Sequence, residues 1–411
     1  MKRMFSIAMA IVMVLTLLCG CSGGEPTERA DALDGTPVTP QDIGLELPGL
    51  DSVGVIPEKQ YFIAFSNGET GNSWSRALVE DMENIAEAYG EQFGMTYEWT
   101  NAGNDSTKQL SDIQSLIAKQ PDLLIVDPNE VEPLAVVYDW CKEANIPLIT
   151  IDKELDIPCD DTYVCKISYD NFFAGLCQGL AAADYLTAKN GTPVGNIAEI
   201  AGVLGASPSI YRSQGLNYAV QQYEDINIAV TRAGEWDNTV SYQAAQDILT
   251  AFPEGTIDFV VGSCDDSAIV FAEAAAAVGR TEFGNAYAGM DCPVEVLRKI
   301  AAGEYYCSVD TGPYYAYYAF EYAINYLNGV EIPDNVLLKA RIFTAETEEK
   351  QAAIEEIIAY CDENGYEFVP AAVGYYDLFS WENDPRIQEL YAQNYYETDA
   401  YKDVPYYVTT D

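Results

Sequence analysis

Residues 121–128 read Pro-Asp-Leu-Leu-Ile-Val-Asp-Pro, and residues 146–153 read Ile-Pro-Leu-Ile-Thr-Ile-Asp-Lys. Each stretch is a short apolar run that ends in an aspartate, which is typical of a strand buried on both faces of a parallel sheet. The stretch just before them, residues 107–118, places four apolar side chains on one face of a helix. Strands that alternate with amphipathic helices in this way predict βαβ units on a parallel sheet.

The same alternation runs through most of the chain. Helices are expected at residues 73–88, opened by a capping serine, at 266–278 and at 347–361. Further strands are expected at residues 61–65, 197–201, 226–231, 259–262, 286–290 and 307–309, with a weaker one at 95–99. The length accommodates two such units, so the expected fold class is α/β, with two Rossmann-like lobes whose parallel sheets are flanked by helices.

The first 20 residues have the layout of an export signal: basic residues, then an apolar run too short to span a bilayer comfortably. The run ends in Leu18-Cys19-Gly20-Cys21, which resembles a bacterial lipobox. Cys21 is therefore the expected lipidation site, and acyl chains there would hold the protein at the extracytoplasmic face of the cell membrane. The alternative is a secreted protein with a free thiol. Residues 21–59 have the composition of a tether.

Composition excludes several classes of function. The chain has 21 Lys and Arg against 65 Asp and Glu, a net charge of −44, which disfavours nucleic acid as a partner. It contains no histidine, so histidine-based catalysis and the commonest metal ligand are ruled out. No phosphate-binding loop of the Gly-x-x-x-x-Gly-Lys-Ser/Thr type is present. We therefore expect neither an enzyme nor a cofactor or metal site.

The ten cysteines show no paired CxxC spacing. Cys141, Cys177 and Cys361 lie in partly apolar helical patterns and are expected to be small buried residues. Cys159 and Cys165 could close a disulfide in an oxidising exterior, an alternative that the sequence leaves open.

Polar residues gather where the predicted strands end. In open α/β sheets, ligands bind beyond the carboxyl ends of the strands, so these positions are candidates for a binding site. They are Asn67 to Asn72 after the first strand, Asp127, Asp152 and Lys153 in the first lobe, and Cys264 to Asp266 and Asp291 in the second. Asp265 and Asp266 are also suited to capping the helix that follows.

Several ordered blocks within residues 61–333 resemble the ribose-binding-protein branch of the type 1 periplasmic binding proteins, which are two-lobed sugar receptors of ABC transporters. The blocks include residues 63–74, 109–128, 146–153, 199–215 and 289–291. The resemblance implies an N-terminal lobe at 60–158 plus 312–341 and a C-terminal lobe at 159–311 plus 342–350. It also implies a hinge of three crossings, near residues 154–162, 310–313 and 340–344. Residues 351–411 are then a tyrosine-rich C-terminal extension.

Position by position, the resemblance implies ligand contacts from both lobes. They are Asn72, Trp74, Ser75, Asp152 and Lys153 from the first lobe, and Arg212, Trp236, Cys264, Asp291 and Thr311 from the second. This set suits a sugar, because two indole rings can cover its apolar faces while charged groups bond its hydroxyls.

Each of these residues also has a purely structural alternative. The two tryptophans could be core residues, Asp152 and Asp291 could be helix N-caps, and Arg212 could pair with a surface carboxylate.

Three positions depart from the family pattern. Cys264 and Thr311 stand where the family has amide side chains, and Lys153 stands where it has an arginine, whose planar fork lysine lacks. A sugar other than plain ribose, or a larger one, is therefore expected. Glu69 and Arg76 are candidates to compensate for the lost bonds.

The expected function follows from these observations. The chain is predicted to be a monomeric extracytoplasmic solute-binding lipoprotein that captures a sugar in the cleft between its lobes and delivers it to an ABC transporter permease. The alternative is a receptor that presents a sugar or another small polar solute to a membrane signalling protein.

Overall fold

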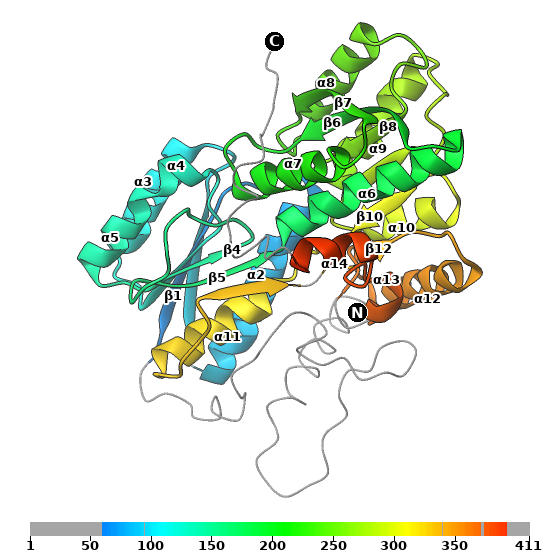
Figure 1. Ribbon diagram of the computed structural model, residues 1–411. Helices are drawn as coiled ribbons and strands as arrows, with labels where there is room; N and C mark the ends of the chain where they lie inside the picture. The colour runs from blue at the N-terminus through cyan, green and yellow to red at the C-terminus, as the bar shows by residue number, and fades with distance from the viewer. Residues whose placement is uncertain (1–59, 94, 339, 371–373, 393–411) are drawn as a thin grey trace, which may run out of the picture. The chain divides into compact units, whose positions relative to one another are not determined.

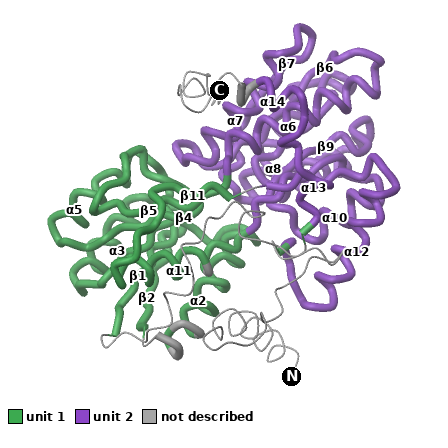
Figure 2. Tube along the Cα trace, turned by 60° about the horizontal axis from the view of Figure 1, so that its bottom comes forward, with its two compact units in different colours: residues 1–169, 313–339, 370–374 green, residues 170–312, 340–369, 375–411 purple. Residues whose placement is uncertain are grey.

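The computed structural model describes residues 60–392 except 94, 339 and 371–373. The predicted signal, the tether and Cys21 therefore lie outside the described residues. The chain divides into two compact units (Figure 2). Unit 1 lies within residues 1–169, 313–339 and 370–374, and unit 2 within residues 170–312, 340–369 and 375–411.

The described part of unit 1 is built on a six-stranded sheet with the order β11-β5-β4-β3-β1-β2, in which every neighbouring pair is parallel. The four residues of β3 and the four of β4 are all buried, as a strand covered on both faces requires. The strands are β1 (Phe62–Asn67), β2 (Thr96–Asn101), β3 (Leu123–Val126), β4 (Leu148–Ile151), β5 (Tyr163–Tyr169) and β11 (Asn335–Leu338).

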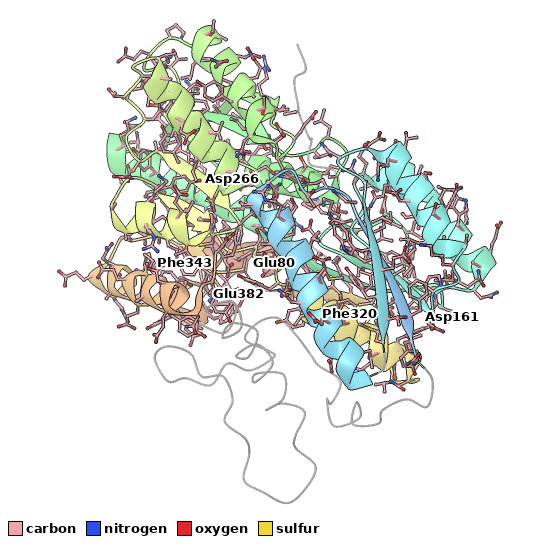
Figure 3. The ribbon with its side chains drawn as sticks, turned by 180° about the vertical axis from the view of Figure 1, so that it is seen from behind. Glu80, Asp161, Asp266, Phe320, Phe343 and Glu382 are labelled. Carbon is pink, nitrogen blue, oxygen red and sulfur yellow. The ribbon has the colours of Figure 1, made fainter. Side chains whose placement is uncertain are left out.

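Helices cover both faces of this sheet (Figure 1). Helices α2 and α11 pack on each other along one face, where Phe320 of α11 (labelled in Figure 3) meets Tyr97 of β2 edge to face at 5.6 Å. Helices α3, α4 and α5 form a second group that also packs together. The bounds are α2 (Ser73–Phe93), α3 (Ser106–Ile117), α4 (Val131–Leu134), α5 (Val136–Ala144) and α11 (Ala316–Leu327).

The described part of unit 2 also contains a six-stranded sheet, with the order β12-β10-β9-β8-β6-β7. All pairs are parallel except β10 with β12, which is antiparallel. The strands are β6 (Val194–Ala201), β7 (Asp225–Ala233), β8 (Phe259–Gly262), β9 (Tyr287–Met290), β10 (Cys307–Val309) and β12 (Ile342–Phe343).

Helices α6 and α7 of unit 2 approach each other very closely, because glycines face the contact. A Cβ atom on Gly175 would lie 1.9 Å from the carbonyl oxygen of Arg212, so a larger residue there would force the helices apart. The helices of unit 2 are α6 (Asn171–Asn190), α7 (Ser207–Val220), α8 (Asn238–Ala251), α9 (Asp265–Ala277), α10 (Val294–Ala301), α12 (Glu348–Asn364), α13 (Tyr376–Phe379) and α14 (Pro385–Ala392).

The α/β fold class and the two lobes are confirmed, and each predicted strand is present with shifts of at most a few residues at its ends. Strands β5, β11 and β12 were not predicted. Because β5 pairs with β4 in the first sheet, the first crossing between the units comes at 169/170 rather than near residue 158. The chain changes unit again at 312/313 and 339/340, and residues 370–374 are also grouped with unit 1.

The C-terminal part after residue 342 belongs mainly to unit 2. Helix α12, which Thr347 caps by accepting a bond from the amide of Lys350, packs against α10. Further on, the guanidinium of Arg386 in α14 bonds Asp184 of α6 at 2.8 and 3.1 Å. Helices α12 and α14 of the predicted extension therefore pack on or bond to helices of unit 2. Within the described ranges, no helix combines the length and apolarity needed to cross a bilayer.

Candidate ligand-binding site

The carboxyl ends of the unit 1 strands carry a buried ion cluster. The loop after β4 begins with Asp152 and Lys153, which are 6% and 3% exposed. The ammonium of Lys153 lies 2.7 and 2.9 Å from the two carboxylate oxygens of Asp127, the residue that follows β3. It also lies 3.2 Å from Oδ2 of Asp152. Lys153 therefore joins the ends of two neighbouring strands.

Electrostatics keep Lys153 charged. Burial alone would lower the pKa of its ammonium, but the surrounding carboxylates outweigh burial and raise that pKa above its ordinary value. Burial has the opposite effect on Asp127, whose pKa it raises, with Asp152 and Glu69 adding to the rise and Lys153 opposing it. The cluster thus holds more carboxylate than its single cation can neutralise.

The loop after β1 shapes the start of α2. The side-chain oxygen of Asn72 accepts bonds from the amide of Ser75 at 2.8 Å and from its hydroxyl at 3.0 Å, so Asn72 and Ser75, both predicted ligand residues, bond each other. This is an N-cap made by an asparagine rather than by the serine that the sequence predicted. Glu69 accepts from the side-chain nitrogen of Asn72 at 3.1 Å. Arg76 is exposed and donates to carbonyls of the loop, including that of Gly71 at 3.3 Å.

Trp74 is connected to this cluster through Tyr315, which sequence reasoning missed. The ring of Tyr315 stands edge to face against Trp74 at 6.0 Å and against Tyr169 at 5.7 Å, and its hydroxyl donates to Oδ1 of Asp152 at 3.4 Å. Tyr315 lies 163 positions from Asp152, so no local pattern could indicate the contact. Trp74 is 9% exposed.

In unit 2, Trp236 and Arg212 share a partner after β8. The indole nitrogen of Trp236 donates to the hydroxyl of Ser263 at 3.1 Å, and Arg212 donates to the carbonyl of Ser263 at 2.6 Å. Arg212 also donates to the side-chain oxygen of Asn171 at 2.8 Å, and its guanidinium lies 6.0 Å from the Trp236 ring. Arg212 is buried, so the surface ion pair considered above does not describe it.

The Trp236 ring lies flat against the backbone of Gly202, which follows β6. A Cβ atom at Gly202 would lie 2.2 to 2.5 Å from atoms of the ring, so only glycine permits this placement. Trp236 packs in a small apolar cluster with Val203, Ala206 and Cys264. The ring is thus rigidly placed and partly a core residue.

The remaining predicted residues of unit 2 follow β8, β9 and β10. Thr311 donates its hydroxyl to Asp291 at 2.9 Å, so these two predicted ligand residues bond each other. The thiol of Cys264 lies 3.2 Å from the hydroxyl of Ser267, and burial raises its pKa well above the ordinary value, so it is a neutral group. Asp265 is wrongly predicted as a helix cap.

Asp265 instead ties the strands together. Its carboxylate accepts from the hydroxyl of Ser308 at 2.6 Å, the hydroxyl of Tyr305 at 2.9 Å and the amide of Cys292 at 2.9 Å. The N-cap residue of α9 is Cys264, whose side chain makes no capping bond to a backbone amide of the helix. Asp265 thus joins the start of α9 to β10 and to the loop after β9.

Backbone conformation is unusual at three predicted ligand residues, and also at Cys292, which is buried with a φ of 56° and was not predicted to bind ligand. Asp152, Trp236 and Asp291 have φ angles of 59°, 52° and 93°, in the left-handed region that side chains rarely adopt. They are 6%, 7% and 8% exposed, whereas Asn104 and Gln120, which also have positive φ, lie in exposed turns. Strained backbone in buried positions is typical of binding sites, where the surrounding structure maintains it.

The N-cap alternative does not apply to two of these residues. Asp152 is followed by a loop and β5, and the N-cap of α10 is Pro293 rather than Asp291. Helix capping therefore does not explain the backbone conformation of either aspartate.

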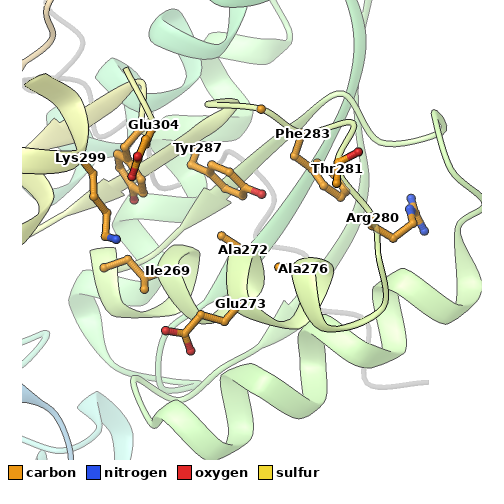
Figure 4. A pocket seen from close by; sticks show the side chains of 12 residues that line it. Ile269, Ala272, Glu273, Ala276, Arg280, Thr281, Phe283, Tyr287, Lys299 and Glu304 are labelled. Carbon is orange, nitrogen blue, oxygen red and sulfur yellow. The ribbon is translucent and has the colours of Figure 1, made fainter. Parts of the chain in front are cut away.

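One surface pocket is lined by none of the predicted ligand residues. It has a volume of about 380 Å³ and is lined by α9, the approach to β9 and the end of α10, with Tyr287 between Arg280 and Lys299 (Figure 4). Tyr287 is the first residue of β9, so the pocket lies at the amino end of that strand. Because parallel sheets bind ligands at the opposite end, we assign the candidate site to the strand carboxyl ends instead.

The structure also shows the state of the cysteines for which roles were predicted. Cys141, Cys177 and Cys361 are buried free thiols, as expected of small apolar residues. Cys159 and Cys165 are free in this structure, and the thiol of Cys159 donates to the carbonyl of Asp334 at 3.2 Å.

Comparisons with known proteins agree with this architecture. A family model described as "Periplasmic binding protein domain" matches residues 63–331, which is more than half of the chain. The galactofuranose-binding protein of Escherichia coli (strain K12) is 23% identical over 302 residues, covering 72% of this chain and 92% of that protein. It is named as a binding protein, in agreement with the prediction that the chain is not an enzyme.

Two solved structures share the fold. The binding protein of an arabinose ABC transporter from Shewanella sp. ANA-3, bound to L-arabinofuranose, has a TM-score of 0.65 and 22% identity, covering 74% of this chain and 98% of that one. The fructose-binding periplasmic domain of a hybrid two-component system has a TM-score of 0.63 and 22% identity, with the same coverage. Together, the matching family model and the two-unit architecture place this chain in the periplasmic binding protein family.

Proposed function

We propose that the chain is an extracytoplasmic solute-binding lipoprotein that captures a sugar between its two units and delivers it to an ABC transporter permease. The observation that carries the proposal is the conformation of Asp152, Trp236 and Asp291. These buried residues, drawn from both units, follow strand carboxyl ends and hold a backbone conformation that costs free energy.

The chemistry of these side chains suits a hydroxylated ligand. An indole ring such as that of Trp236 offers a flat apolar face to the C–H groups of a sugar. The carboxylates of Asp152 and Asp291 can each accept charge-assisted hydrogen bonds from hydroxyls of the sugar. Each such bond contributes about 1.5–3 kcal/mol. The ligands named for the relatives, galactofuranose and arabinofuranose, support the sugar class.

The proposed mechanism is closure of the two units around the ligand, as in other periplasmic binding proteins. A sugar that bonds residues of both units stabilises the closed form by its differential affinity for that form. The permease then recognises the closed, loaded monomer. Acylation of Cys21 would keep the protein beside the permease, because two acyl chains suffice for stable attachment.

The test is a ligand screen with the fragment 60–411. Thermal-shift measurements against monosaccharides, oligosaccharides, polyols, nucleosides and amino acids should give a rise in Tm with a carbohydrate, because a ligand that binds only the folded state stabilises it. Titration calorimetry then measures Kd. A rise in Tm confined to nucleosides or amino acids would contradict the proposal.

Two variants test the site itself. Trp236→Ala should weaken carbohydrate binding by about tenfold or more, equivalent to about 1.4 kcal/mol. The matched control is Trp99→Ala, because Trp99 lies on β2 and bonds Glu83 on the surface at 3.0 Å. Equal Kd values for both variants would remove Trp236 from the site.

A sensing role is the second candidate. The similarity to the fructose-binding periplasmic domain of a hybrid two-component system favours it, since that domain shares the fold and belongs to a signalling system. Uptake of the labelled ligand by cells that lack this protein discriminates between the two roles. Uptake falls if the protein serves a transporter and is unchanged if it serves a sensor.

A further inference from the structure

Three carboxylates in unit 1 share a single ammonium. Asp127, Asp152 and Glu69 are 1%, 6% and 7% exposed, and Lys153 between them is 3% exposed. The ammonium bonds Asp127 and lies near Asp152, so the cluster carries an excess of two negative charges when all its members are ionised. Buried charges normally require a counter-charge, because transfer out of water is costly.

The third carboxylate belongs to the same cluster because two loops pack closely. A Cβ atom at Gly68 would lie 3.2 Å from the carbonyl oxygen of Asp127 and 3.3 Å from backbone atoms of Asn129, so the loops after β1 and β3 touch there. Glu69, the next residue, raises the pKa of Asp127 by repulsion. Its own bonds come from neutral donors, the amide of Gly71 and the side chain of Asn72.

The end of β1 and the loop after β3 hold two further acceptor oxygens. Oδ1 of Asn67 and Oδ1 of Asn129 are buried and have no hydrogen-bond partner among the described residues. A buried acceptor without a donor costs about 1–3 kcal/mol, so both oxygens favour a donor arriving from outside. The shortage in these loops is therefore of donors and of positive charge together.

An ammonium group would supply both the missing hydrogen-bond donors and the missing positive charge, because it carries three donors, no acceptor and one positive charge. A hydroxyl supplies a single donor and no charge. A metal ion at the centre of the cluster would have to displace Lys153, whose ammonium already bonds both oxygens of Asp127.

We propose that the ligand of this site carries a protonated amine, as in an aminated sugar or polyol, and that the acidic loops of unit 1 bind that ammonium. The inference rests on the proposed function, since it names the substrate class of the same site.

The test compares matched ligands by titration calorimetry with the full fragment at neutral pH. Glucose, glucosamine and N-acetylglucosamine form one series, and galactose with its corresponding derivatives forms another. The third series is myo-inositol with an aminated inositol and its acetamide. In at least one series, the amine should bind about tenfold or more tightly than both the neutral parent and the acetylated compound, which is the weaker end of the contribution of a charged hydrogen bond.

The outcomes separate the two proposals. A neutral sugar that binds as tightly as its amine, or more tightly, overturns the inference and leaves the proposed function standing. If no compound of any series binds, the proposed function falls, and the inference falls with it.

Variants locate the ammonium independently of the wild-type comparison. Asp127→Asn removes one charge at constant size and should lower the ratio of amine to parent affinity at least threefold, whereas Lys153→Gln should raise it. Asp160→Asn is the matched control, because that carboxylate is exposed and bonds Tyr138 at 2.7 Å outside the cluster. An Asp127→Asn ratio equal to that of the control would overturn the assignment to these loops.

Discussion

Replacing Gly202 with alanine tests whether the position of one indole ring determines ligand affinity. The new Cβ atom would lie 2.2 Å from Cε2 and 2.3 Å from Cζ2 of Trp236. Carbon atoms pack at about 3.5–4.0 Å, so the ring must move by more than about 1 Å. The backbone of Gly202 needs no unusual conformation, because it is not among the glycines with positive φ.

The loss in free energy of unfolding follows from the contacts that the displaced ring no longer makes. The ring loses the 3.1 Å bond from its nitrogen to Ser263, about 0.5–1.5 kcal/mol, and the 6.0 Å contact with the guanidinium of Arg212, about 0.5–1 kcal/mol. The free energy of unfolding should therefore fall by about 1–2.5 kcal/mol. Carbohydrate affinity should fall by about tenfold or more, since the displaced ring no longer matches the ligand face.

Urea unfolding and titration calorimetry measure the two quantities. Gly179→Ala is the control, because its Cβ atom would lie 2.5 Å from Cβ of Ala219 where α6 packs on α7. The control should lose stability and keep its affinity. If Gly202→Ala binds the sugar as tightly as the wild type, the ring is not a ligand platform and the reasoning fails.

Three further substitutions have expected outcomes. Lys153→Met leaves Asp127 and Asp152 buried without their cation and should lower the free energy of unfolding by about 3–5 kcal/mol in a urea titration; a loss below about 1 kcal/mol would contradict a buried ion cluster. Burial raises the pKa of Glu199, so the folded state retains that proton to higher pH than the unfolded state, and stability should fall as pH rises from 4.5 through the folded pKa. Glu199→Gln should remove this slope, and Tm curves of the variant and the wild type that run parallel from pH 4 to 8 would refute the prediction. Asp291→Ala should weaken carbohydrate binding by about tenfold while changing Tm little, and unchanged affinity would exclude it from the site.

The sheets were predictable because parallel strands buried on both faces are continuous apolar runs. Strand β5 was missed because Lys166 interrupts its apolar pattern, and the structure accommodates that charge by a 3.1 Å ion pair with Glu154. Strand β12 has two residues, too few to form a pattern, and β11 is not a continuous buried run, because Asn335 and Leu337 are exposed.

The candidate site was predictable only in part. The rule that ligands bind at strand carboxyl ends identified Asp152 and Asp291 from their position alone. Their neighbours were not predictable, because Tyr315 and Ser263 reach the site through long-range contacts that leave no periodic signal. The positive φ of Asp152 also has no counterpart in the sequence, since aspartate adopts many conformations.

Neither unit is made from a continuous piece of chain, and this affects the order in which the protein can fold as it emerges. The sheet of unit 1 lacks its edge strand β11 and its covering helix α11 until residues 316–338 are available, long after residue 169. The strands that are synthesised first therefore expose an apolar surface until α11 is available. Intermediates with such a surface aggregate readily. A nascent chain halted near residue 300 should therefore bind holding chaperones through residues 62–169, which contain the uncovered strands.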